Sequence, residues 1–368
     1  MTAETEIHFF SLSAPLRWML SAVVFAFVGG FANPSDACTS FVQKTPDGTL
    51  FGANLDLLVP ADGVVAVNRR GIAKENFRKS TAGKTLKWVS KHGSITFNVA
   101  GRGFPWGGMN EAGLVVSGME EMQSEFPGPD RRYPFDLGSW IQYVLDTCST
   151  VSDVVAVDGS IRPEADNNRP SHFLVADARG EVAALEYIDG KLVVYRGQSM
   201  PIAAMANMPY DRALYAYRND GARWWWSNPG RSAERVAIAA NRIATYDPAR
   251  DKNPLSHVFH TLRMVANPDT RWSVAYNIEK RKIWFRTSRS RAGKYLSFRD
   301  FDFSCNAPSL LLDVHTPVSG HVADAFAPYT HEKNLTLFET TCARLGIHIS
   351  HQDAVHVMRD FEGFTCAQ

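Results

Sequence analysis

Hydrophobic and polar positions alternate along much of the chain after residue 38, with the two-residue period typical of β-strands. Thr39–Lys44 and Thr49–Asn54 alternate on either side of Pro46-Asp47-Gly48, whose residues favour a tight turn, so this stretch predicts a β-hairpin. Met109–Gly113 predicts another turn, in which Gly113 supplies a positive φ. Gly101–Gly108 is rich in glycine and is predicted to be a loop. Further strands are predicted at Val64–Asn68, Ile95–Val99, Leu114–Ser117, Phe173–Asp177, Val182–Tyr187, Leu192–Tyr195, Arg271–Ile278 and Lys282–Thr287.

Helical spacing of apolar residues interrupts these strands at a few places. In Phe135–Thr147 the apolar residues recur every three to four positions, which predicts a helix with one buried face. Further helices are predicted at Thr150–Val157, Ala233–Thr245, Asn253–Val265 and Leu335–Leu345. Runs of strands therefore alternate with runs of helices, an order that favours an α+β fold or layered sheets with helices outside.

The N-terminal segment has a different pattern. Arg17 precedes an apolar stretch from Met19 to Ala32, and small residues follow up to Ser35-Asp36-Ala37. A basic residue, a short apolar core and small residues are typical of a secretory signal. We therefore expect residues 1–37 to be removed and residues 38–368 to form a single domain of a secreted or periplasmic protein, with no stable membrane insertion after processing. The acidic Glu4 and Glu6 and the length of the apolar run leave a retained membrane anchor as the alternative.

The charge and the cysteine content of the chain limit the functions and the disulfides that can be expected. The 368 residues are 45% hydrophobic and 21% charged, with a formal net charge of +1 and no long basic run, which argues against nucleic-acid binding. Five cysteines follow the predicted cleavage point, and an odd number leaves at least one thiol unpaired. We expect Cys38 to be free and Cys148 to lie in the core. The four cysteines other than Cys38 could form two disulfides or stay reduced.

Cys38 directly follows the predicted cleavage point and begins the first strand. Cleavage there would give one residue both a thiol and a free α-amine. A thiol with a pKa of about 8.5 is mostly protonated at neutral pH, and an α-amine with a pKa of about 8 can accept its proton. Cys38 could then supply nucleophile and base together. A bridged or buried strand cysteine is the alternative interpretation.

The residues around Cys38 resemble those of a known family. The chain contains, in order, Cys38-Thr39-Ser40-Phe41, Phe51–Asp56, Met109–Leu114, Ala206-Asn207-Met208-Pro209, Ser232-Ala233-Glu234-Arg235 and a late hairpin from Trp272 to Thr287. This ordered set resembles the choloylglycine hydrolase family, which includes bile salt hydrolases and penicillin V acylases. The resemblance spans about 250 residues.

The resemblance implies an α+β fold, a four-layer αββα N-terminal-nucleophile hydrolase sandwich of two antiparallel sheets between helix layers. It implies that Cys38 is the nucleophile, that Asp56 holds its amine or thiol, and that Arg235 favours the thiolate. The side chain of Asn207 and the backbone N–H of Glu120 would stabilise the oxyanion. No metal or organic cofactor is implied, and because the family is often tetrameric, a homotetramer is the implied assembly.

Two positions depart from the family pattern. Ala53 stands where the family usually has arginine, which leaves Arg235, Arg69 or Arg70 to supply a positive charge. Glu120 stands where bile salt hydrolases usually have asparagine, and its carboxylate would oppose anionic substrates. Asn110 is interpreted as a turn residue rather than a catalyst.

We therefore expect a hydrolase that cleaves linear amides of N-acylated small molecules, such as penicillin V or N-acyl-homoserine lactones, through a thioester on Cys38. Trp106, in the predicted Gly101–Gly108 loop, and Trp224 and Trp225 are expected to shape an apolar acyl pocket. Two alternatives remain open at this point. One is a conjugated bile salt hydrolase, and the other is a secreted N-acyl-ligand-binding protein without catalytic activity.

Overall fold

Two β-sheets form the centre of the computed structural model, which describes residues 38–57, 62–76, 78–164, 170–220, 232–344, 346–359 and 365–367. The seven-stranded sheet has the order β14 (Ala204–Ala206), β1 (Thr39–Thr45), β2 (Gly48–Asp56), β15 (Thr270–Asn277), β16 (Lys282–Thr287), β17 (Lys294–Ser297) and β19 (Gly320–His321). Its pairings are antiparallel except for β17 with β19. The predicted hairpin is therefore present as β1 and β2, and it lies inside the sheet.

The nine-stranded sheet supplies the opposite layer. Its order is β13 (Lys191–Arg196), β12 (Val182–Ile188), β11 (Ser171–Ala176), β8 (Val115–Glu120), β7 (Pro105–Asn110), β6 (Ser94–Asn98), β3 (Val64–Asn68), β18 (Leu310–Asp313) and β20 (Ala327–Pro328). Two short pairs stand apart from it, β4 (Ala73–Glu75) with β5 (Lys87–Val89) and β9 (Tyr133–Phe135) with β10 (Ile161–Pro163).

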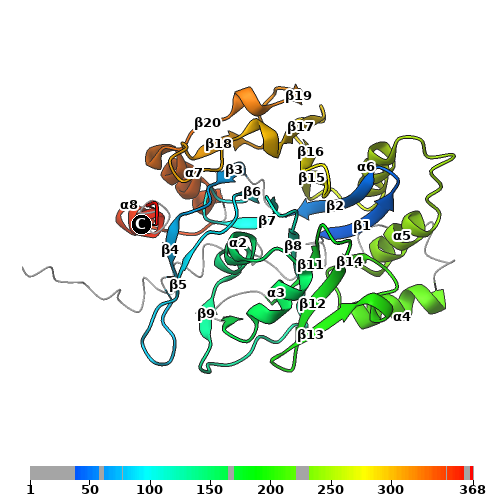
Figure 1. Ribbon diagram of the computed structural model, residues 1–368, viewed down its shortest axis with the longest axis horizontal. Helices are drawn as coiled ribbons and strands as arrows, with labels where there is room; N and C mark the ends of the chain where they lie inside the picture. Colours follow the sequence, from blue (N-terminus) through cyan, green and yellow to red (C-terminus); the bar gives the residue numbers. More distant parts are fainter. Residues whose placement is uncertain are drawn as a thin grey trace, which may run out of the picture.

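Helices cover the outer faces of both sheets (Figure 1). Helices α5 (Ser232–Ala244) and α6 (Pro254–Met264) pack on β1, β2, β14 and β15, and α4 (Tyr210–Asp220) packs on α5. Helices α2 (Leu137–Thr147) and α3 (Val151–Val157) lie on the nine-stranded side, where α2 contacts β7 and β8. The layers are thus helix, sheet, sheet, helix, as expected. Helices α7 (His331–Arg344) and α8 (His351–Arg359) complete the C-terminal part.

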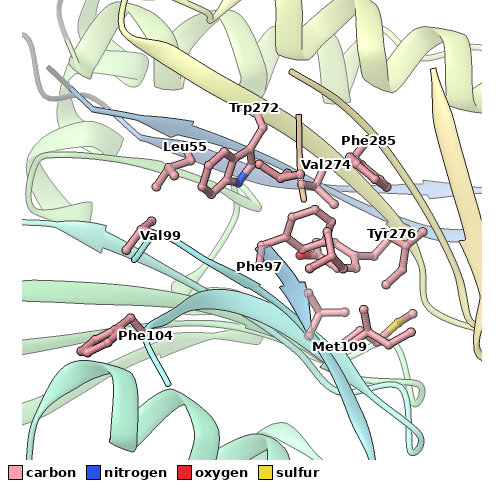
Figure 2. Packing of buried hydrophobic residues seen from close by; sticks show 14 of the residues in the cluster. Leu55, Phe97, Val99, Phe104, Met109, Trp272, Val274, Tyr276 and Phe285 are labelled. Atoms are coloured by element: carbon pink, nitrogen blue, oxygen red, sulfur yellow. The ribbon is translucent and has the colours of Figure 1, made fainter. Parts of the chain in front are cut away.

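Aromatic and aliphatic side chains fill the space between the sheets (Figure 2). Phe97 of β6 packs edge-on against Phe285 and Tyr276 of the facing sheet, with ring centroids 5.4 and 6.2 Å apart. Alternation places these residues inward, while Trp284 on β16 and Phe41 on β1 pack outward beneath α6. The inner face of the seven-stranded sheet, on which Cys38 lies, is therefore fixed by the core.

The structure differs from the sequence-based expectations at several places. The predicted loop Gly101–Gly108 becomes strand from Pro105 onward. Helices α4 and α8 were not predicted. The four cysteines other than Cys38 form neither two disulfides nor four reduced thiols. Cys305 and Cys366 form one disulfide, while Cys148 and Cys342 are buried free thiols. Helix α2 begins at Leu137, two residues later than predicted, where the Asp136 carboxylate caps it by accepting from the Ser139 N–H.

Within the described ranges, no helix is long and apolar enough to cross a bilayer.

Candidate active site

Cys38 lies immediately before strand β1, and its side chain is only 3% exposed. Its neighbour Thr39 pairs with Ala206 of β14 on one side and Asn54 of β2 on the other, so the cysteine is held between two strands. The thiol is free, and its Sγ lies 3.8 Å from the backbone oxygen of Asp56. Burial first, and then the negative charge of Asp56, raise the pKa of Cys38 to about 12. This thiol therefore needs a base before it can act as a nucleophile.

Asp56 ends strand β2 beside Cys38 and is 2% exposed. Its Oδ2 accepts a hydrogen bond from Asn267 Nδ2 at 3.1 Å and lies 3.6 Å from an Arg235 nitrogen. Its Oδ1 has no hydrogen-bond partner within the described part of the chain. Burial raises the pKa of Asp56 to about 7, and the nearby Arg235 opposes that rise. The carboxyl group thus has one oxygen available for a donor on Cys38.

Arg235 is the positive charge of the site. It lies in the first turn of α5, is fully buried, and donates to Ser232 Oγ at 2.9 Å and Asn207 Oδ1 at 3.4 Å. Its charge lowers the pKa of Cys38, against the larger effect of burial. Of the three arginines considered to replace the missing one at Ala53, Arg235 is the one beside the thiol.

The two other arginines serve structural contacts elsewhere. Arg69 donates to the backbone oxygens of Cys305 and Ala307, and Arg70 pairs with Glu111. Asn110 binds the carbonyls of Leu145 and Cys148 and accepts from the Leu114 N–H, so it is a turn residue as expected.

Asn207 and Glu120 connect the two sheets next to Cys38. Asn207 follows β14, and its Nδ2 donates to the backbone oxygen of Glu120, the last residue of β8, at 2.7 Å. An amide nitrogen carries two N–H groups, so one donor of Asn207 remains for another acceptor. The carbonyl oxygen of Asn207 accepts from Arg235, which fixes the orientation of the amide. The predicted oxyanion residues therefore lie together.

Trp106, on β7, is half-buried against the core that contains Cys38. Its indole N–H lies near the Cys38 thiol and lowers the pKa of that thiol, while the ring faces the same apolar cluster. Trp106 therefore belongs to the site as predicted, although it comes from a strand rather than a loop. Trp224 and Trp225 lie outside the described residues.

Three supporting groups were missed from the sequence. Asn267 comes from the turn between α6 and β15, and Ser232 begins α5. Behind Glu120, the buried His172 on β11 binds Glu186 Oε1 through Nδ1 at 2.8 Å, and the same oxygen accepts from the Tyr210 N–H. The polar His172 in an otherwise apolar strand was the available signal.

This geometry suits acyl transfer by a cysteine. A thiol, a buried carboxyl group, an arginine and an oriented amide converge here. In a chain that began at Cys38, its own α-amine would be a base on the same residue as the thiol. A nucleophile, a positive charge and an oxyanion donor are the elements that amide hydrolysis requires.

Comparisons with known proteins agree with this chemistry. The family model of linear amide C–N hydrolases, choloylglycine hydrolase family, matches residues 38–221. A penicillin V acylase of Pectobacterium atrosepticum is 25% identical over 79% of this chain and 90% of its own length.

Two solved structures share the fold. A penicillin V acylase from Agrobacterium tumefaciens superposes with a TM-score of 0.67 at 23% identity, covering 80% of this chain and 98% of that one. A conjugated bile acid hydrolase variant from Clostridium perfringens gives 0.59 at 18% identity, covering 80% and 97%. The four layers are those of N-terminal-nucleophile hydrolases.

Proposed function

Because the chain belongs to the choloylglycine hydrolase family of linear amide C–N hydrolases, we propose that it cleaves N-acylated small molecules through a thioester on an N-terminal Cys38. The observation that carries this proposal is the position of Cys38. Its thiol begins a central strand within reach of Asp56, Arg235 and the Asn207 amide. Each of these side chains has a defined part in the reaction.

The first half of the reaction forms the acyl-enzyme. The α-amine of Cys38 takes the Sγ proton, and the thiolate attacks the carbonyl carbon of the amide. The free N–H of Asn207, with the backbone N–H of Glu120, stabilises the oxyanion of the tetrahedral intermediate. The Cys38 ammonium then protonates the departing nitrogen, the C–N bond breaks, and a thioester remains on Sγ.

The second half restores the enzyme. The α-amine of Cys38 accepts a proton from water as the water oxygen attacks the thioester carbonyl. The new tetrahedral intermediate collapses, the C–S bond breaks, and the carboxylic acid leaves while the thiol recovers its proton. Asp56 keeps the ammonium in place through the carboxylate oxygen that lacks a partner among the described residues. Arg235 supplies a fixed positive charge beside this carboxylate and beside the thiolate that forms on Cys38.

Processing belongs to the same proposal. Removal of residues 1–37 would expose the Cys38 amine and leave residues 38–368 as a single secreted or periplasmic domain. The homotetramer implied by the family is also part of it.

Penicillin V-type or N-acyl-homoserine-lactone-type substrates fit best. The relative that is 25% identical is a penicillin V acylase, and the apolar Trp106 beside the thiol suits an aryl or alkyl acyl chain. Conjugated bile salts are the second candidate, and the solved bile acid hydrolase with the same fold favours including them. The Glu120 carboxylate would oppose an anionic group placed next to it, so it disfavours bile conjugates bound with their acidic group on that side.

A substrate panel tests the proposal. The processed enzyme is incubated with phenoxyacetyl, long-chain acyl-homoserine lactone and bile-conjugate amides, and the released amine is quantified. We expect turnover of the first two classes and loss of at least a thousandfold in Cys38→Ala. Cys148→Ala is the matched control, because Cys148 is a buried free thiol away from the site, and it should keep its activity. Turnover that survives Cys38→Ala would contradict the proposal.

A further inference from the structure

A second pocket lies on the outer side of the seven-stranded sheet, away from the thiol. It encloses about 640 Å³ between α6, strands β16 and β17, and the segment that joins α5 to α6. Six basic residues line it, and among its lining residues Asp251 is the only carboxylate. The formal excess is therefore five positive charges when the histidines are neutral. The six are Arg242, Arg250, Lys252, Arg263, Arg286 and Lys294.

Most of this charge is not neutralised by the protein. Arg263, Arg286 and Lys252 have no carboxylate partner within the described ranges. Arg286 instead places its guanidinium 4.6 Å from the centre of the Phe259 ring. Asp251 lies 3.7 Å from Arg250, which is largely exposed, so this pair neutralises little. Cations thus outnumber carboxylates in this concave surface.

The N-terminal end of helix α6 also contributes positive electrostatic potential to the pocket. Its N-cap Asn253 and its early residues Leu255 and Ser256 line the pocket, so the positive end of an 11-residue helix faces it. His257 and His260 lie on the same helix. Burial first, and then the Arg242 guanidinium, lower the pKa of each.

The pocket is separate from the amidase site. Arg235 lies in the first turn of α5 and Arg242 lies near its end, seven residues later, which corresponds to roughly 10 Å along the helix axis. Helix α6 lines the pocket from Leu255 to Arg263, and only the chain after its end reaches the amidase site, where Asn267 binds Asp56. An acyl substrate bound at Cys38 lies on the inner face of the sheet, whereas the pocket opens on the outer face beneath the helices.

We propose that this pocket binds a small organic molecule that carries two or more phosphate groups. Paired phosphates match several arginines at once, because each guanidinium offers a planar fork of donors. Trp284 and Phe259 provide apolar walls for the rest of the ligand. The enclosed volume suits a small molecule rather than a protein or nucleic acid. A soluble phosphate ester and a phosphorylated lipid headgroup share this chemistry.

Calorimetric titration of the processed full-length enzyme with pyrophosphate, at about 0.1 M salt, tests the site. We expect saturable one-site binding that weakens at least tenfold in Arg263→Gln/Arg286→Gln, with orthophosphate binding more weakly than pyrophosphate. The matched control is Lys191→Gln/Lys333→Gln, which removes the same charge from exposed positions on β13 and α7 and should bind like the parent. Circular dichroism and Tm verify that each variant is folded.

Three outcomes would overturn the proposal. They are no saturable binding, equal weakening in both double variants, and full binding by Arg263→Gln/Arg286→Gln. Co-sedimentation with vesicles containing a phosphatidylinositol monophosphate, a lipid with two phosphate groups, separates the sources. Vesicle binding that is lost in the same variant assigns the phosphate to a lipid headgroup, and pyrophosphate binding without vesicle binding assigns it to a soluble ester. Because binding is measured without turnover, the result is independent of the proposed amidase function.

Discussion

The protonation state of Asp56 determines whether a negative charge is buried beside Cys38. Burial raises the pKa of this carboxyl to about 7, from an ordinary value near 3.8. The folded protein therefore holds a proton that the unfolded chain releases at a lower pH. A raised carboxyl pKa lowers stability as the pH rises between the two values, because the buried group must then ionise. Between about pH 4 and pH 7 the cost grows to a few kcal/mol.

Asp56→Asn removes this titration. We expect the free energy of unfolding of the variant, relative to the parent enzyme, to rise as the pH is raised from 4 to 7 and to stay level above that, while activity is lost. Urea unfolding at a series of pH values measures the difference. The slope should be steeper when one residue is left ahead of Cys38, since a free α-ammonium would lower the pKa of Asp56. A pH-independent difference would contradict the assigned pKa.

At this scale, the resemblance predicted which candidate residues lie together but did not predict the groups that support them. The ordered resemblance identified Cys38, Asp56, Asn207 and Arg235, and the structure brings them together. Asn267 could not be found, because it lies 211 positions from Asp56 in the chain and meets it only through the pairing of β15 with β2. A turn asparagine with a local role looks the same in sequence.

Among the elements, the contact between the end of β8 and the turn after β14 is central. One Asn207 N–H spans from the seven-stranded sheet to the Glu120 carbonyl of the nine-stranded sheet. The same amide is the proposed oxyanion donor, so under this proposal one side chain would both link the sheets and contact the substrate.

Replacement of Asn207 separates these two roles. Asn207→Ala should lower kcat by about 100- to 1000-fold, which corresponds to roughly 2.7–4 kcal/mol of transition-state stabilisation. Loss of its two part-buried hydrogen bonds, to the Glu120 oxygen and from Arg235, should cost only about 2 kcal/mol of stability. Steady-state kinetics and thermal unfolding measure both effects. A kcat within fivefold of the parent enzyme would show that Asn207 is not an oxyanion donor.

Element prediction failed where glycine had a packing role. Gly107 and Gly108 suggested a loop, yet both lie inside β7. A Cβ on Gly107 would lie 2.7 Å from the Val116 oxygen, and one on Gly108 would lie 2.5 Å from the Ile95 oxygen. The neighbouring strands approach so closely that only glycine fits. Composition cannot distinguish this use of glycine from a turn.

For the molecule as a whole, the disulfide between Cys305 and Cys366 fixes the C-terminal part. It joins positions 61 residues apart, after α7 and α8 have packed on the inter-sheet core. Cross-linking so long a segment restricts the unfolded chain, an effect typically worth about 2–4 kcal/mol. The bond lies away from Cys38, so stability and catalysis should be separable.

Cys305→Ser/Cys366→Ser should therefore lower the free energy of unfolding by about 2–4 kcal/mol and leave kcat/KM unchanged below the new Tm. Chemical denaturation under oxidising conditions measures the loss, and the parent enzyme treated with a reductant provides a comparison. An unchanged denaturation midpoint would contradict a stabilising role, and lost activity in a folded variant would contradict the separation.

Alternation predicted an α+β or layered fold, and the resemblance implied the order of the four layers. Neither predicted that the C-terminal helices pack into the core between the two sheets. Both sheets direct side chains into one cluster, and helices α7 and α8 add Phe338, Cys342 and Met358 to it. Helix α7 is only weakly amphipathic, whereas α8 is clearly amphipathic but only nine residues long. Long-range packing of this kind leaves little trace in local sequence.

The central claim is that Cys38 acts with its own α-amine. The direct test is N-terminal sequencing and intact mass of the exported protein, before and after treatment with a thiol-alkylating reagent and after quenching during substrate turnover. We predict a chain that starts at Cys38, a single alkylation on that residue that substrate prevents, and an acyl adduct on the same peptide. A chain that starts upstream and still turns over substrate, or an acyl group on another residue, would contradict the account.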